Sequence, residues 1–324
     1  MGNIHRNTEY VDWLGELRPL YGNVVEATSL APPTPTPTPS TTAPITPTPT
    51  NTPTNTTTPT NTPTNTTTPT NTPTPSPPPF DSDAAAYLAE VLAQGGTLNA
   101  TISGATNTMF TDLKLEGLYN KLFCLYPLIG ETADSHAINA VNLTAFTIGW
   151  TAGITHDSLG SKGNGTSAYG NSNWVQNSET TASNTSLGFY MSVSGNNAYD
   201  MGRQVSGGYL SINNYQSATN FRVAVNSGLA NLETNMSGET GFYALSRNNS
   251  TEVHRYVPSN PGVTTSSSET AALATSSCLL MATGGIASYS SKTYGTFFIG
   301  EGLSLSELQN LASIIITFNN TIGR

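Results

Sequence analysis

The chain has 324 residues, enough for one large domain or two ordinary ones. Only 10% of its residues are charged, and 20 acidic against 11 basic side chains give a formal net charge of -9. So few Lys and Arg provide no basic surface for a phosphate backbone, and we therefore expect no nucleic-acid partner. Two cysteines are too few for a disulfide scaffold or a cysteine-rich zinc site.

No apolar run approaches the roughly 20 residues needed to cross a bilayer, so we expect no membrane insertion. Residues 1–20 lack the apolar centre of a secretory signal, which predicts that the protein is not exported by that route. The composition then changes abruptly at two places. These changes divide the chain into segments 1–30, 31–79 and 80–324.

Residues 1–30 are too few to bury a core, yet they carry closely spaced apolar and aromatic side chains. The three-residue spacing of Val11, Leu14 and Leu17 predicts a short helix that ends before Pro19. A segment that cannot fold alone and is tethered to a long spacer is typical of a docking peptide. The expected anchor residues are Tyr10, Val11, Trp13, Leu14 and Leu17. The alternative is a tail in which Trp13 packs on the C-terminal domain of the same chain.

Residues 31–79 hold 17 of the 21 prolines and no charged or aromatic residue. The sequence NTPTNTTTPT occurs at 51–60 and again at 61–70. Frequent proline favours polyproline II and excludes helix, and few apolar side chains are present to offset the entropy of ordering. We therefore expect a spacer that reaches about 150 Å when extended. An inert low-complexity insertion is the alternative.

Three helices are predicted after the spacer. The first runs over 84–93, with an Asp or Ser cap just before it and a glycine stop just after it. The second runs over about 111–123, where several leucines fall on one face. The third starts at Ser304, because Glu307 stands at the capping-box position and an apolar stripe follows.

Between these helices, short segments rich in β-branched and aromatic residues alternate with Gly, Asn and Ser turns. Short strands at this spacing predict a β-sandwich or a barrel. The expected strands cover residues 145–151, 187–194, 208–213, 220–226, 241–247, 252–257 and 293–299.

Three segments carry a resemblance to a known group of domains: 118–130 (with LYNKL and LYPLIG), 241–247 (GFYALSR) and 297–324 (opening with FFIGEGLS). They are similar to phage-associated concanavalin A-like (laminin-G-like) domains, and the resemblance covers about residues 105–324. It implies a mainly β, jelly-roll sandwich with a few flanking helices. It also implies a virion appendage protein with carbohydrate recognition and no transferable catalytic motif.

Catalytic patterns are missing from the sequence, including the Glu-x-Asp-x-x-Glu arrangement of sandwich glycosidases. The neighbouring acidic pairs Glu131/Asp134 and Asp81/Asp83 fit turns and helix caps. The four histidines show no zinc-binding spacing. We therefore expect no catalysis, no metal and no cofactor.

Two further groups are expected to be structural. Asp200, Arg203 and Arg247 are candidates for an ion pair within the sandwich. Cys124 and Cys278 lie in apolar stretches and are expected to be buried free thiols rather than a disulfide.

One polar loop region, 156–177, combines aromatic side chains with amides. Sugar recognition needs an aromatic face surrounded by polar groups. We predict a carbohydrate site formed by His156, Asp157, Asn164, Tyr169, Asn171 and Trp174. The alternative is that Trp174 packs in the sandwich and that the Asn/Gly run only forms turns.

The resemblance, taken with these patterns, predicts a non-enzymatic virion appendage of a bacteriophage, such as a head fibre, a decoration protein or a tail-fibre-like protein. Its N-terminal peptide is expected to bind a capsid or tail protein, its sandwich to bind surface glycans, and the chain to form a homo-oligomer. The alternatives are a purely structural decoration protein without an external ligand, a cell-surface adhesin and a polysaccharide depolymerase.

Overall fold

The computed structural model describes residues 9–11, 17–19 and 80–324, except residues 197, 215–219, 229 and 235–238. The chain divides into two units, Met1–Thr72 and Pro73–Arg324. The predicted spacer, residues 31–79, lies outside the described residues.

In the first unit, β1 (Glu9–Val11) pairs with β2 (Leu17–Pro19) as an antiparallel hairpin. The short helix predicted across these residues is therefore wrong. Tyr10 and Val11 favour extended backbone, because aromatic and β-branched side chains fit a pleated strand better than a helix. The predicted anchor residues Tyr10, Val11 and Leu17 lie in these strands, whereas Trp13 and Leu14 lie outside the described residues.

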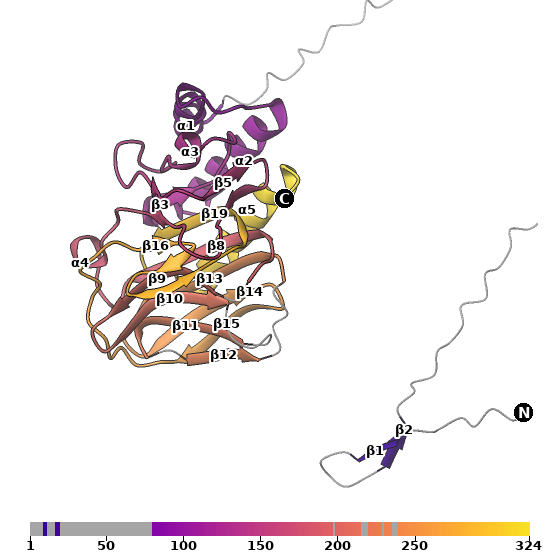
Figure 1. Cartoon of the computed structure of the whole chain (residues 1–324), viewed down its shortest axis with the longest axis vertical. Helices are drawn as coiled ribbons and strands as arrows, with labels where there is room; N and C mark the ends of the chain where they lie inside the picture. Colours follow the sequence, from indigo (N-terminus) through magenta and orange to yellow (C-terminus); the bar gives the residue numbers. More distant parts are fainter. Residues whose placement is uncertain are drawn as a thin grey trace, which may run out of the picture. The chain divides into compact units, whose positions relative to one another are not determined.

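The second unit is mainly β, and its described strands form two large antiparallel sheets that enclose a common core (Figure 1). The seven-stranded sheet has the order β12 (Ala230–Thr234), β11 (Asn220–Ser227), β10 (Gly208–Asn214), β9 (Ala198–Val205), β16 (Leu279–Leu280), β7 (Gly170–Asn171) and β4 (Gly149–Trp150). The eight-stranded sheet has the order β15 (Asn260–Ser266), β14 (Glu252–Val257), β13 (Gly241–Arg247), β8 (Thr185–Val193), β19 (Thr293–Gly300), β6 (Gly160–Lys162) and β5 (Thr155–Asp157), with β3 (Leu122–Tyr126) also paired to β19. A small hairpin of β17 (Ala282–Thr283) and β18 (Ile286–Tyr289) contacts β9. The predicted mainly β sandwich with a few flanking helices is confirmed.

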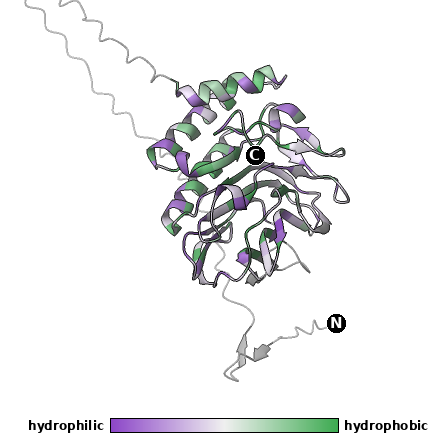
Figure 2. Ribbon diagram, turned by 90° about the vertical axis from the view of Figure 1, so that its left-hand side faces the viewer, coloured by the Kyte–Doolittle hydropathy of each residue, from purple (hydrophilic) through white to green (hydrophobic). Residues whose placement is uncertain are grey.

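Successive side chains of a strand point to opposite faces of its sheet, and here they enter two different hydrophobic cores. One core lies between the two sheets, and the other lies between the eight-stranded sheet and the helices. On β8, Phe189 points between the sheets and Tyr190 points to the opposite face. On β13, Tyr243 and Phe242 alternate in the same way. The opposite face is covered by helices, and Figure 2 shows hydrophobic and hydrophilic residues alternating along them, as expected for helices with one buried face.

The helical layer is built on the eight-stranded sheet. The longer helices are α1 (Ser82–Ala93), α2 (Ala100–Leu115) and α5 (Leu305–Thr321), and the short ones are η1 (Tyr119–Lys121), α3 (Ala133–His136) and α4 (Gln176–Glu179). Helix α5 contacts β13, β14 and β15, α2 packs on α5, and α1 packs on α2. None of the helices in the described residues is both long and apolar enough to span a membrane.

Helix capping explains where α1 and α5 begin, and both predictions are confirmed. The Asp81 side chain accepts hydrogen bonds from the N–H groups of Asp83 and Ala84. At α5, Ser304 and Glu307 form the predicted capping box.

The prediction of the second helix is wrong in position, because α2 covers residues 100–115 instead of 111–123. Asn99 caps its start by accepting the N–H of Ile102. Gly117, with φ +67°, adopts a left-handed conformation just after the helix. The leucine-rich stretch that follows pairs with β19 as strand β3, since backbone pairing and burial outweigh its helical spacing.

A buried ion pair joins the two sheets. The Asp200 Oδ1 on β9 lies 2.6 Å from the Lys292 Nζ next to β19, and the two side chains are 0% and 2% exposed. The Tyr294 hydroxyl donates to the same oxygen at 2.6 Å. Of the other predicted partners, Arg247 instead donates to the backbone carbonyl of Val225. Cys124 and Cys278 are both buried and free, as predicted.

Substituting Lys292→Met should destabilise the domain by about 3–5 kcal/mol, because the Asp200 carboxylate would stay buried without the ammonium beside it. The matched control is Lys121→Met, which breaks the partly exposed pair with Glu307 and should cost less than about 1 kcal/mol. Urea unfolding followed by circular dichroism measures both. Equal costs for the two variants would contradict the structural role assigned to the buried pair.

Candidate functional site

A hollow of about 520 Å³ lies where α1, α3 and the loop before β4 meet. Trp150, on the edge strand β4, lines it and is half-buried. The other lining side chains are the polar Glu90, Gln94, Asp134 and Thr147 and the apolar Ala133, Ala137, Ile138, Leu143 and Ile148. The hollow therefore combines an aromatic side chain with carboxylate, amide and hydroxyl groups.

Three contacts hold the Trp150 ring in place. Its Nε1 donates to the backbone carbonyl of Ala133 at 3.0 Å. Its ring meets the His156 ring edge-on, with 5.1 Å between centroids. A Cβ on Gly170 would lie 2.6 Å from the Trp150 Cζ3, so only glycine lets the ring lie this close to β7. The ring is thus oriented before any ligand arrives.

Behind this ring, two histidines and a serine tie α3 to β5 and β6. The Nδ1 atoms of His136 and His156 lie 3.2 Å apart, and each lies within 3.0 Å of the Ser161 Oγ. The His136 Nε2 accepts the N–H of Glu131, so neutral His136 carries its proton on Nδ1. This arrangement has room for one proton between the two Nδ1 atoms but not for two.

Electrostatics keep both rings neutral. Burial, followed by the neighbouring His156, lowers the pKa of His136 from 6.5 to about 2. Burial also lowers the pKa of His156. In the described residues, no group of three or more His, Cys, Asp or Glu side chains is placed to hold a metal ion. Through their hydrogen bonds to Ser161 and to the backbone of Glu131, the two rings support the wall of the hollow.

The residues predicted for a sugar site take several positions. His156 packs against Trp150, and Tyr169 stacks on Tyr289 with 6.2 Å between centroids. Asp157, Asn164 and Asn171 each accept backbone N–H groups from the residues that follow them. Such hydrogen bonds are those of Asx turns, so these three side chains shape the loops. Binding by this set stays a prediction.

Trp174 lies apart from the hollow. Its side chain is 1% exposed and stacks on Phe123 in the core between the sheets, with 6.1 Å between centroids. It offers no face to a sugar in this structure, and its position matches the alternative in which it packs in the sandwich.

The sequence reasoning missed the lining residues Trp150, Glu90 and Asp134. Trp150 falls within an expected strand, where an aromatic residue usually indicates core packing. Asp134 fits a turn, and Glu90 fits the polar face of a helix. No local signal marks Trp150 as exposed, because the Thr-Ala-Gly that follows it indicates only a turn.

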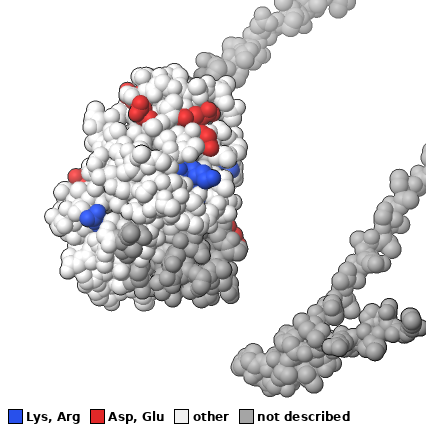
Figure 3. All heavy atoms as spheres, viewed as in Figure 1, with Lys and Arg blue, Asp and Glu red and all other residues white. Residues whose placement is uncertain are grey.

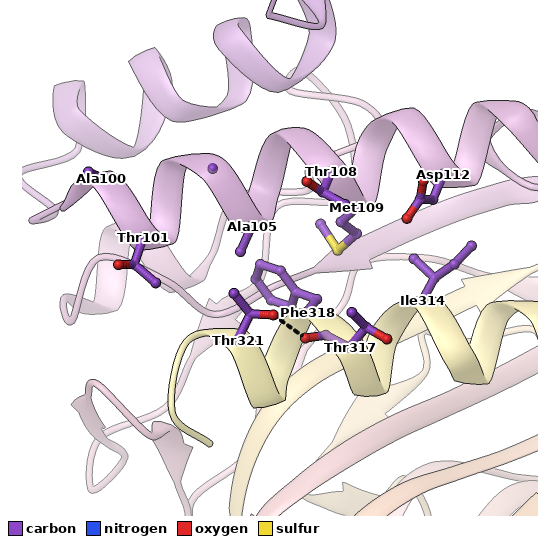
Figure 4. A pocket seen from close by; sticks show the side chains of 11 residues that line it. Ala100, Thr101, Ala105, Thr108, Met109, Asp112, Ile314, Thr317, Phe318 and Thr321 are labelled. Atoms are coloured by element: carbon purple, nitrogen blue, oxygen red, sulfur yellow. Dashed lines mark hydrogen bonds between the residues drawn. The ribbon is translucent and has the colours of Figure 1, made fainter. Parts of the chain in front are cut away.

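A second hollow, of about 310 Å³, lies between α2 and α5 (Figure 4). Met109 and Phe318 form its floor, and threonines such as Thr101 and Thr317 lie along its rim. Its aromatic ring offers little to a ligand, because Phe318 is only 2% exposed. The Trp150 hollow is therefore the stronger candidate for binding a polar ligand with an apolar face.

The free energy of unfolding should fall as the pH drops below about 6.5, because His136 regains its ordinary pKa in the unfolded chain and binds a proton there. This contribution to stability is fully present above pH 6.5, and about 2 kcal/mol of it should be lost by about pH 5. Urea unfolding across this range measures the effect. His136→Gln should flatten the pH profile, whereas a wild-type stability that is constant or rising toward pH 5 would refute the assignment.

The chain matches no protein-family model and no curated protein sequence. Among solved structures, domain 4 of a GH43 extracellular arabinanase from Geobacillus stearothermophilus, in complex with arabinotriose, is 15% identical, with 59% of this chain and 98% of that chain covered and a TM-score of 0.42. The Trypanosoma rangeli sialidase is 13% identical, with 68% and 40% covered and a TM-score of 0.42. The receptor binding domain of botulinum neurotoxin D is 10% identical, with 60% and 53% covered and a TM-score of 0.39. The chain thus spans about half or less of the last two proteins, and at this similarity none of them assigns it a ligand.

Proposed function

We propose that this protein is a non-catalytic carbohydrate-binding protein whose sugar site is the Trp150 hollow. The observation that carries the proposal is a half-buried tryptophan, fixed by three contacts, at the edge of a hollow with polar walls. Sugars present an apolar ring face and a rim of hydroxyl groups. In such a hollow the indole ring can pack on the apolar face, and the polar walls can hydrogen-bond the hydroxyl groups.

The polar groups suit sugar hydroxyls in number and type. Gln94 and Thr147 are exposed and offer both donors and acceptors. Glu90 accepts a hydrogen bond from Gln94 at 2.7 Å, which aligns the two side chains on successive turns at the end of α1. The apolar floor excludes water beneath the sugar face, and Leu143, 37% exposed, extends it outward.

Substituting Trp150→Ala in the full chain should weaken binding to the preferred oligosaccharide of a glycan array by about tenfold or more, since buried aromatic anchors carry most of the binding energy in small sites. The matched control is Tyr169→Ala, which removes a half-buried aromatic side chain of the sugar site predicted from the sequence, outside the Trp150 hollow. Thermal unfolding of each variant checks that the domain is intact.

If Tyr169→Ala abolishes binding and Trp150→Ala does not, the sugar site lies on the loop and the proposal for the hollow fails. If the wild-type chain binds no glycan on the array, the carbohydrate-binding function fails and a purely structural role takes its place.

Glycoside hydrolysis is the second candidate, because two carboxylates, Glu90 and Asp134, line the same hollow. Incubating the protein with a bound oligosaccharide and measuring new reducing ends separates the two functions. We expect no release, and release that is lost in Glu90→Gln would establish the enzyme instead.

We further propose that the domain is displayed on a bacteriophage particle, with the N-terminal unit bound to a capsid or tail protein and the spacer between them. An isolated two-stranded hairpin is marginally stable in water, so the hairpin of β1 and β2 would gain stability from a partner surface. The resemblance of residues 105–324 to phage-associated domains and the proline-rich composition of residues 31–79 support this placement.

Mass spectrometry of gradient-purified particles should find the chain in a fixed ratio to the major capsid protein. A copy number near that of the capsid indicates a head decoration, and a few copies per particle indicate a tail component. Absence from purified particles would remove the virion placement and favour a cell-surface adhesin.

A further inference from the structure

We infer that the Trp150 hollow selects sugars that carry protonated amines over neutral sugars and disfavours sugars that carry carboxylates. This inference rests on the proposed function, and it concerns the class of ligand rather than the existence of the site. It follows from the charge of the walls and from where the basic side chains of the domain are engaged.

The walls of the hollow carry acidic side chains and no basic ones. Glu90 and Asp134 line it from α1 and α3, and none of the ten lining residues is Lys or Arg. Asp134 is exposed at the first turn of α3. Figure 3 shows acidic side chains gathering at the end of the domain formed by these helices. A ligand in the hollow therefore meets a negative potential.

Two basic side chains of the domain, Lys114 and Arg324, are engaged elsewhere. Lys114 pairs with Asp81, the N-cap of α1, and with Asp83 in its first turn, about two helical turns from Glu90. Arg324 donates to backbone carbonyl oxygens, including those of Leu128 and Ser158, and does not line the hollow. Neither cation is positioned to receive a sugar carboxylate there.

The aromatic ring adds to the same preference. The face of an indole ring attracts cations, by about 0.5–1 kcal/mol at exposed sites. An ammonium beside one partly exposed carboxylate gains about 0.2–1 kcal/mol. A sugar amine near Trp150 and one carboxylate should therefore bind about threefold to thirtyfold more tightly than its neutral N-acetyl counterpart. A sugar carboxylate meets repulsion from both walls and gains nothing from the ring.

The test compares three trisaccharides by calorimetry with the full chain: a glucosamine trimer, an N-acetylglucosamine trimer and a galacturonic acid trimer. All three are measured in one buffer at about pH 6, below the pKa of an amino group. The expected order of affinity is amine first, neutral second and carboxylate last. Added salt should reduce the differences in affinity between the three trimers, because the selectivity is electrostatic.

The variants Glu90→Gln and Asp134→Asn should remove the preference for the amine, measured in each variant as the ratio of the affinities for the amine trimer and the neutral trimer. The matched control is Glu179→Gln, an exposed acid on α4 outside the hollow, which should keep the preference. Urea unfolding of each variant confirms that the fold is retained.

Equal affinity for all three trimers, or tighter binding of the carboxylate trimer, would overturn the inference while leaving the carbohydrate-binding function in place. Loss of the preference in Glu179→Gln would also overturn it, since the hollow would not be its source. If none of the three trimers binds and the glycan array is also empty, the proposed function itself fails.

Discussion

The sandwich depends on one buried ion pair, between Asp200 and Lys292. Removing two charges from water costs several kcal/mol per ion, and only close geometry with additional hydrogen bonds offsets that cost. Both requirements are met, because the charged atoms lie 2.6 Å apart and the Tyr294 hydroxyl donates to the same carboxylate oxygen. The pair also restricts register: a one-residue slip of β9 would turn Asp200 to the other face of its sheet, away from its partner. The two residues are 92 positions apart, so no local pattern in the sequence indicates which cation Asp200 meets.

Strand β19, next to Lys292, connects the buried ion pair to the candidate site through its neighbouring strands. Strand β19 pairs with β8, β6 and β3, and β6 pairs in turn with β5, which holds His156. After β3 the chain continues to α3, where the Ala133 carbonyl accepts a hydrogen bond from the Trp150 Nε1. Arg324, just after α5, ties the same elements together by donating to the backbone carbonyls of Pro127, Leu128, Ser158 and Gly295. The hollow is therefore framed by elements that hydrogen bonds tie to the central strands, although its lining comes largely from short helices and loops.

The parts of the fold that follow from local chemistry could be predicted, and those that follow from distant contacts could not. Ser304 and Glu307 define the start of α5 by themselves, since a capping box needs only residues three apart. The start of α2 at Asn99 was missed because the helix carries threonines and a glycine and has a weakly apolar stripe, whereas the leucines after it have helical spacing but pair as a strand. Trp150 and Trp174 show the same limit at the site. Trp150 stands between Gly149 and Thr151, and Trp174 between Asn173 and Val175, so neither local sequence indicates exposure. The packing against β7 and β3 decides which ring reaches the surface.

The proposed site has the physical character of a weak binder that gains strength by repetition. One indole ring and a few exposed polar groups bury little area, and each polar group must first give up its water. Such a site alone is expected to discriminate between ligands by modest factors rather than to bind tightly. When several copies of the domain are held together, binding of one copy raises the effective concentration of ligand for the others. The overall affinity then increases without any new interaction within a single site. The proposed spacer, residues 31–79, would widen the range of ligand spacings that such copies can bridge, but a longer tether also lowers the effective concentration. Such an arrangement favours ligands presented densely, such as repeated sugars on a surface, over isolated ones.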